Sequence, residues 1–189
     1  MDRAKISIAV CVDSKTFTKF AMFDTLRRQR RFVSPAIFMG ILLFFSLLAF
    51  SRVGKSEQAL LLGIVLASIS ILLPAAYLLS FLLSVKAQIK KLGLSATRYA
   101  YTLHFDESGV AVTAGREKVY HQWGDLYGAY RLPGYIYLYA TSQRAFLLPE
   151  GQLNGIDGGA DGLWKMLSQR MLSSGIKDLR REKRALAAQ

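Results

Sequence analysis

Two long runs without a charged residue constrain most strongly what this chain can fold into. The first covers residues 32–50 and the second covers residues 59–85. A helix needs about 20 apolar residues to cross the hydrocarbon core of a bilayer, and both runs approach or exceed that length. A helix buried in a soluble protein normally keeps a polar stripe, which neither run shows. We therefore predict two membrane-spanning helices, the longer one kinked at Pro74.

Only residues 51–58 separate the two runs, so the helices are expected to form an antiparallel hairpin with both chain ends on one side. Basic residues crowd the two hairpin ends that lie away from this loop. They are Arg27, Arg28, Arg30 and Arg31 before the first helix, and Lys86, Lys90 and Lys91 after the second. The positive-inside rule therefore predicts that both termini are cytoplasmic. The same residues are candidates for contact with anionic lipid headgroups.

The hairpin by itself is not expected to conduct ions or solutes. Neither run contains a charged side chain, and two helices enclose no aqueous path. Gly63, Ala67 and Ser68 form a patch of small residues where helices can approach closely. We expect this patch to pack the two helices of one chain together, and homo-oligomerisation through it is the alternative.

The formal net charge of +12 is distributed unevenly. Residues 99–176 are close to neutral, whereas the basic excess flanks the apolar runs and ends the chain. This pattern favours anionic lipid headgroups over nucleic acid, which needs a basic face on the folded domain. The tail 176–189 is predicted to be helical. Its basic residues Arg180, Arg181, Lys183 and Arg184 are either a solvated helix end or a patch that binds headgroups.

Beyond residue 98 the apolar pattern changes from a helical period to alternation, which is typical of strands. Turn residues separate six expected strands, at 99–105, 110–114, 118–123, 126–132, 135–140 and 144–148. An amphipathic helix over 161–172, capped by Asp161 and carrying Trp164 on its apolar face, is expected to close the open end of the sheet. Residues 5–12 also alternate, and we predict that this N-terminal segment adds a seventh strand.

The expected fold class is therefore a membrane α-helical hairpin joined to an α+β domain. The strand and basic helix of 1–31 precede the hairpin of 32–85. Residues 99–175 are expected to form a bent antiparallel sheet or partial barrel capped by a helix, and 176–189 form the basic tail.

Several stretches carry a resemblance to a known family. FDESGV, KVYHQWGDL, YIYLY and AFLLPE follow an N-terminal strand, a basic helix and two apolar runs. This order and these motifs are similar to the YcxB-like family of bacterial membrane proteins. The resemblance implies a pleckstrin-homology-like C-terminal domain and a place in the bacterial cytoplasmic (inner) membrane, but no established reaction. Glu150 stands where a basic residue is common, so no role of a basic residue is carried over to this position.

The residue inventory does not favour catalysis. The motifs HExxH, CxxC and GxSxG and the P-loop do not occur. The Gly-rich loop that contains Asp157 lacks the spacing of a calcium loop. We therefore expect that the protein is not an enzyme and that it has no catalytic residue, metal ligand or cofactor.

The aromatic residues near the centre of the predicted sheet are first interpreted as structural. Trp123 is expected to anchor the core, and Asp125 is expected to cap the turn after it. A half-buried stack across the strands is expected from Tyr127, Tyr130, Tyr135, Tyr137 and Tyr139. The functional alternative is that these tyrosines form a surface for a peptide or a lipid.

These observations favour a membrane-tethered module that binds or scaffolds an unidentified protein partner through a groove or a sheet edge. An anionic-lipid sensor is the first alternative. The second is an accessory subunit of a membrane transporter, in which the hairpin would carry the partner contacts. Nucleic acid is not an expected partner.

Overall fold

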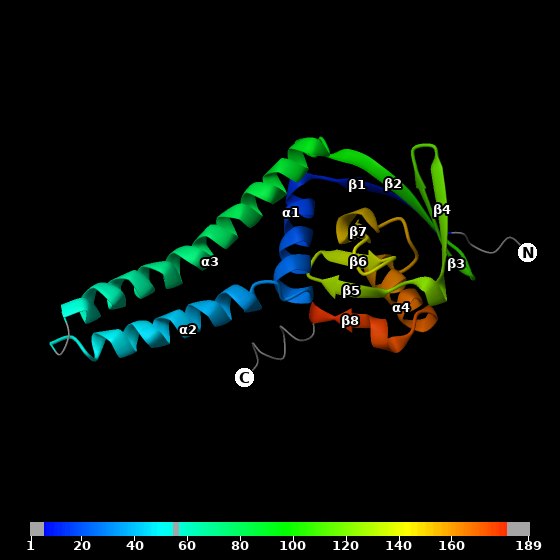
Figure 1. The fold of residues 1–189 in the computed structure, drawn as a ribbon. Helices are drawn as coiled ribbons and strands as arrows, with labels where there is room; N and C mark the ends of the chain where they lie inside the picture. Colours follow the sequence, from blue (N-terminus) through cyan, green and yellow to red (C-terminus); the bar gives the residue numbers. More distant parts are fainter. Residues whose placement is uncertain (1–5, 55–56, 181–189) are drawn as a thin grey trace, which may run out of the picture. The chain divides into compact units, whose positions relative to one another are not determined.

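The structure is a computed structural model that describes residues 6–54 and 57–180 (Figure 1). Contacts within the chain divide it into two compact units. Unit 1 combines Met1–Phe17 with Leu94–Gln189, and unit 2 is Thr18–Gly93.

Unit 2 is helical. Helix α1 (Ser14–Met22) enters it and is followed by the π-helical turn η1 (Phe23–Arg28) and by two long helices, α2 (Val33–Phe50) and α3 (Glu57–Lys91). α2 agrees closely with the first predicted span. α3 is longer than predicted, because it continues past residue 85 to Lys91, and it remains helical through Pro74.

The helices α2 and α3 pack through small and polar residues. Ser46 is buried, and its hydroxyl donates a hydrogen bond of 2.8 Å to the carbonyl oxygen of Gly63. A Cβ atom on Gly63 would lie 2.8 Å from the ring of Phe50, so a larger residue at this position would require that ring to shift. Nearer the other end of the pair, the rings of Phe32 and Tyr77 lie 6.1 Å apart.

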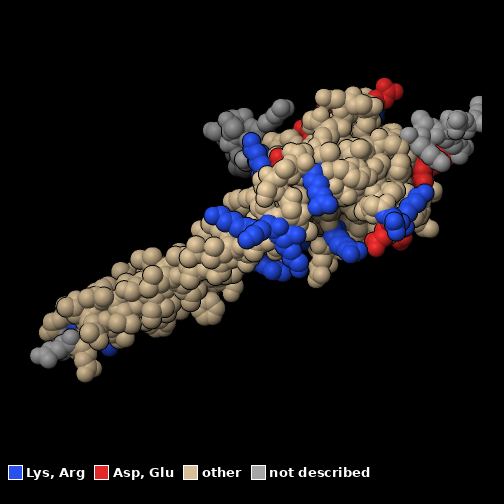
Figure 2. Space-filling view, turned by 90° about the horizontal axis from the view of Figure 1, so that it is seen from above, with Lys and Arg blue, Asp and Glu red and all other residues tan. Residues whose placement is uncertain are grey.

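Most apolar side chains of these helices point outward. Only 17% of the most hydrophobic window of α2 and 22% of that of α3 is buried. Both helices are long and apolar enough to cross a membrane, with mean hydropathies of 2.3 and 2.5. Figure 2 shows no Lys, Arg, Asp or Glu along the middle of the visible face of this pair. The two helices are therefore candidate membrane spans.

Unit 1 contains two four-stranded sheets. The first has the order β1 (Ile6–Val12), β2 (Arg98–Phe105), β3 (Gly109–Ala114), β4 (Glu117–Gln122), and all its strands are antiparallel. The second has the order β7 (Ala145–Pro149), β6 (Tyr135–Tyr139), β5 (Gly128–Leu132), β8 (Ile176–Asp178), and β8 runs parallel to β5. The described residues thus form an α+β unit with two sheets and no closed barrel. The predicted helix over 176–189 is wrong at its start, because Ile176–Asp178 pair with β5 as a strand.

The N-terminal segment is part of the first sheet. β1 pairs with β2 from Ile6 opposite Phe105 to Val12 opposite Arg98, although the two segments are separated in sequence by all of unit 2. Gln152 of the 3-10 turn η3 (Glu150–Gln152) exchanges two hydrogen bonds, of 2.8 and 2.9 Å, with the backbone of Cys11. These bonds connect β1 to the chain that leaves the second sheet.

Helix α4 (Gly159–Arg170) covers the core of unit 1. Its residues Leu163 and Leu167 are fully buried, as are Ile136 and Leu148 of the second sheet. The helix begins two residues earlier than predicted, after Gly158 in the left-handed backbone region at φ 73°. Asp161 therefore lies in its first turn and is not its cap.

The corner between β2 and β3 is held by Asp106. Its carboxylate accepts hydrogen bonds from the backbone N–H groups of Ser108 (2.9 Å) and Gly109 (2.7 Å). Burial alone would raise the pKa of Asp106, but these bonds and two hydroxyl donors outweigh it, so the pKa is lowered overall. Trp123 is buried there and stacks on Phe105 at 6.3 Å. Asp125, predicted to cap the turn after Trp123, is exposed and is the last residue of the 3-10 turn η2 (Trp123–Asp125).

Candidate functional site

The five predicted tyrosines do not share one surface. Tyr137 and Tyr139 on β6 are each 1% exposed, so they belong to the core and not to a docking face. Tyr130 and Tyr135 are half-buried, and Tyr127 is 53% exposed. The reason is that β6 lies between β5 and β7 and is covered on both faces, which removes the inside–outside alternation that the sequence suggested.

Tyr127 and Tyr130 do share a surface hollow, which we call the tyrosine hollow. Its volume is about 260 Å³, and it is lined by Leu126, Tyr127, Tyr130, Met171, Leu172, Ser174, Gly175 and Lys177. Leu172 is 72% exposed, although it is a large apolar residue. Aromatic, aliphatic and basic side chains thus meet around this hollow.

A second hollow, of about 410 Å³, lies where β5, α4 and β8 meet. We call it the Arg131 cavity, and it is lined by Arg131, Asp161, Trp164, Lys165, Ser168, Asp178 and Arg180. The two hollows share no lining residue, and β8 and its flanks contribute to both.

Arg131 is the only charged side chain among the described residues that is buried, at 2% exposed. Its Nη1 lies 2.7 Å from Oδ1 of Asp161, and its Nε lies 3.1 Å from Oε1 of Glu150. The guanidinium also lies over the ring of Trp164, 5.9 Å from its centroid. A buried charge is tolerated only with such partners, because it has lost its hydration.

Asp161 therefore acts as an ion-pair partner. Hydrogen bonding and attraction to Arg131, followed by contacts with Arg180, hold the pKa of Asp161 below its usual value. Glu150 is the second acceptor for Arg131.

Arg180 connects the end of the described chain to this network. It lies 3.4 Å from Asp161, 3.5 Å from Glu150 and 3.5 Å from Asp178. Arg180 therefore forms its ion pairs within unit 1. The other predicted headgroup contacts of the tail, Arg181, Lys183 and Arg184, lie outside the described residues.

The basic residues beside the apolar helices belong to unit 2. All but one of them are exposed: Arg27, Arg30, Arg31, Lys86, Lys90 and Lys91. Arg28 is the exception, since it is half-buried and forms an ion pair with Asp24 one helical turn earlier. The exposed side chains are in contact with solvent, whereas Arg28 is held by its own helix.

Sequence reasoning missed the Arg131 network. The available signal was a charged residue within the short apolar strand GAYRL, where Arg131 lies on the same face as Ala129. The strand period places both side chains inward, so an acidic partner had to come from elsewhere in the fold. Within residues 6–54 and 57–180, no group of three His, Cys, Asp or Glu residues is arranged to hold a metal ion.

Comparison with known proteins gives one match. Residues 105–157 match a family model described as YcxB-like protein. The matched region runs from the end of β2 to the loop before α4 and includes Arg131 and Glu150. No curated protein and no solved structure matches the chain.

Proposed function

Taking the assignment of this chain to the YcxB-like family as the premise, we propose that it is a membrane-tethered module that binds another protein. The α2–α3 hairpin anchors it in the bacterial cytoplasmic membrane, with both termini in the cytoplasm. Unit 1, as a domain of pleckstrin-homology-like type, presents the tyrosine hollow to the partner. The chain carries out no reaction of its own in this proposal.

The outward-facing apolar side chains of unit 2 support the membrane anchor. A helix in a soluble core hides most of its apolar residues, whereas these helices expose them along their length. Six exposed basic residues occur at the hairpin ends away from the short loop, whereas the described part of the loop carries only Arg52. This asymmetry is the arrangement that the positive-inside rule assigns to the cytoplasm.

The tyrosine hollow is the observation that carries the binding role. Tyr127 and Leu172 are both large, apolar and mostly exposed, and they line the same depression with Met171 and Lys177. Burying such side chains against a partner removes apolar surface from water, at about 25 cal/mol per Å². Tyrosine also keeps a hydroxyl for a hydrogen bond, which is why it is enriched at interfaces.

The test is chemical crosslinking of the full chain in its native membrane, followed by mass spectrometry of the captured proteins. We compare the wild type with Tyr127→Ala/Leu172→Ser, and with Tyr99→Ala/Val119→Ser as a control on other exposed apolar residues. A partner lost only from the first variant supports the proposal. Identical partner sets in all three chains would reject the hollow as the binding surface.

The same experiment distinguishes an accessory subunit of a transporter. In that case the hairpin carries the contacts, so replacing residues 32–85 with an unrelated hairpin removes the partner and the Tyr127/Leu172 variant retains it.

Anionic-lipid sensing is a second candidate, favoured by the exposed cations of unit 2. Native mass spectrometry of the full chain should show fewer retained anionic lipids after Lys86→Glu, Lys90→Glu and Lys91→Glu together. The matched control reverses two other exposed cations, Arg116 in the β3–β4 turn and Lys118 near the start of β4. Equal lipid retention in both variants would exclude this role for the three lysines.

A further inference from the structure

We propose that β8 is an exchangeable strand and that β5 of one copy accepts β8 from a second copy of this chain. The protein would then form a strand-swapped dimer. This inference goes beyond the binding of a different protein, and neither proposal depends on the other.

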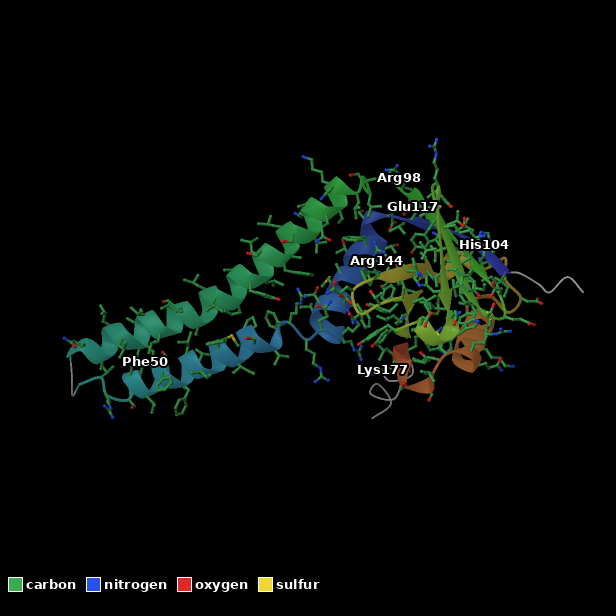
Figure 3. All side chains as sticks on the ribbon, turned by 45° about the vertical axis from the view of Figure 1, so that its right-hand side comes forward. Phe50, Arg98, His104, Glu117, Arg144 and Lys177 are labelled. Carbon is green, nitrogen blue, oxygen red and sulfur yellow. The ribbon has the colours of Figure 1, made fainter. Side chains whose placement is uncertain are left out.

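β8 is weakly held as a strand. It contains three residues, Ile176–Asp178, and it is an edge strand that pairs only with β5. It is also the one parallel strand among the pairs of the described sheets, and parallel pairing is slightly less stable per residue than antiparallel pairing. Lys177, labelled in Figure 3, lies on this short strand. Such an element can leave its site without disturbing the antiparallel core.

The site that β8 occupies is nevertheless specific. A Cβ atom on Gly128 would lie 2.6 Å from the carbonyl oxygen of Gly175, so this backbone approach needs glycine. Lys177 faces the tyrosine hollow, whereas Asp178 lines the Arg131 cavity. Arg180, two residues further on, reaches Glu150 and Asp161. The segment and its site therefore match in backbone shape, alternation and charge.

This match identifies the occupant. The segment seen on the β5 edge is the chain's own 176–180, and a second copy carries the same residues in the same order. A strand from that copy can make every contact that the internal strand makes, which is why exchange of identical elements is an inexpensive route to a dimer. Confinement to one membrane would raise the effective concentration of the second copy.

The connection to β8 can act as the hinge. It runs from Met171, at the end of α4, to Gly175, and Leu172, Ser173 and Ser174 are exposed. The exposed side chains of Leu172 and Tyr127 line the hollow beside this connection.

The experiment uses two tagged full-length chains, both carrying Cys11→Ala, expressed together. One carries Tyr130→Cys and the other carries Lys177→Cys, at positions that are partners in the β5–β8 register. A disulfide needs a Cα–Cα separation of about 4.4–6.8 Å, and paired residues on neighbouring strands lie within this range. Mild oxidation in the membrane is expected to give a disulfide-linked heterodimer, because each cysteine has its partner only in the other copy.

Two controls make the result decisive. A single chain with both cysteines reports β8 docking inside one molecule. A second pair of chains carries Leu132→Cys and Tyr135→Cys, which are register partners within the β5–β6 hairpin and cannot exchange across its two-residue turn. Exchange is rejected if the Tyr130/Lys177 mixture gives no crosslink, whether or not the single chain with both cysteines does. It is also rejected if the mixture crosslinks no better than the hairpin control.

A measurement without cysteines tests the same inference when a cysteine variant folds poorly. The mass of the native chain in detergent is expected to be that of a dimer, and Gly175→Ala is expected to reduce it to a monomer. Gly151→Ala, where an added Cβ meets nothing within 4 Å, is expected to leave the dimer intact. A monomeric native chain, or a dimer unaffected by Gly175→Ala, contradicts exchange through β8.

Discussion

A Cβ atom on Gly128 would lie 2.6 Å from the carbonyl oxygen of Gly175, and one on Gly175 would lie 3.0 Å from the carbonyl oxygen of Tyr127. The backbone of β5 therefore touches the turn that leads into β8. Neither glycine has a positive φ, so both are required by space and not by backbone conformation. The attachment of the last described strand depends on these two residues.

Gly128→Ala is expected to detach β8, because the added methyl carbon would lie 2.6 Å from the carbonyl oxygen of Gly175. A backbone oxygen cannot move aside as the end of a flexible side chain can. Trypsin should then cut after Lys177 faster than in the wild type, and mass spectrometry of the released peptide measures the rate. Gly151→Ala serves as the control, since its added Cβ meets open space. Equal cutting in both variants would show that the close approach is not needed.

Arg131→Gln is expected to lower the free energy of unfolding of unit 1 by about 3 kcal/mol, the lower part of the range for breaking a buried ion pair. The lower part applies because Glu150 and Asp161 keep contact with water after the change. Denaturant titration followed by tryptophan fluorescence measures the loss. Arg144→Gln, at an exposed position, should change stability by less than about 0.5 kcal/mol; a similar loss for both arginines would contradict a special role for Arg131.

Asp106→Ala is expected to destabilise unit 1 by about 1.5–3 kcal/mol, because backbone donors at the β2–β3 corner lose a charged acceptor. Asp125→Ala is expected to have an effect below about 0.5 kcal/mol, since Asp125 is exposed. The same denaturant titration compares the two variants. A larger loss for Asp125→Ala would restore the capping role that the sequence predicted for it.

The contribution of Asp161 should depend on pH in one direction. Its pKa in the folded chain is lowered from the ordinary value of 3.8, with Arg131 as the main cause. The stabilisation is therefore complete above about pH 3.8 and is lost as the pH falls through the folded pKa. The melting temperature of Asp161→Asn should lie below that of the wild type at pH 7, and the gap should close as the pH falls below 3.8.

Asp157→Asn, in the exposed loop before α4, is the control for that measurement and should leave the melting temperature unchanged at each pH. A gap between the wild type and Asp161→Asn that stays constant down to pH 2 would show that the charge of Asp161 does not hold Arg131.

Ile71→Arg tests whether α3 spans a bilayer. Ile71 is 63% exposed near the middle of the helix, and an arginine at the centre of a span costs about 3 kcal/mol for insertion. The fraction of full-length chain that stays in the membrane pellet after a carbonate wash should fall. Ser95→Arg, beyond the helix, is the control. An unchanged pellet fraction for Ile71→Arg would favour a helical pair outside the bilayer.

The sequence by itself determined the elements whose pattern is local. Two uncharged runs long enough to cross a membrane form α2 and α3. A helix makes its backbone hydrogen bonds within itself, so it forms whatever its side chains face. The alternation of apolar and polar residues predicted strands β2 to β7 within a few residues of their observed bounds. The Asp-Glu-Ser-Gly turn was also readable, since an aspartate bonds to backbone groups two and three residues further on.

Only the tertiary structure decided the relationships between distant segments. Coverage of β6 on both faces buries Tyr137 and Tyr139, although their alternation resembled that of a half-exposed strand. The buried charge of Arg131 is stabilised by ion pairs with Glu150 and Asp161. These two partners come from η3 and α4, so only the tertiary structure brings them to Arg131. β8 follows no local pattern, since three residues form a strand only where a neighbour's edge, a matching glycine and a charged site are already in place.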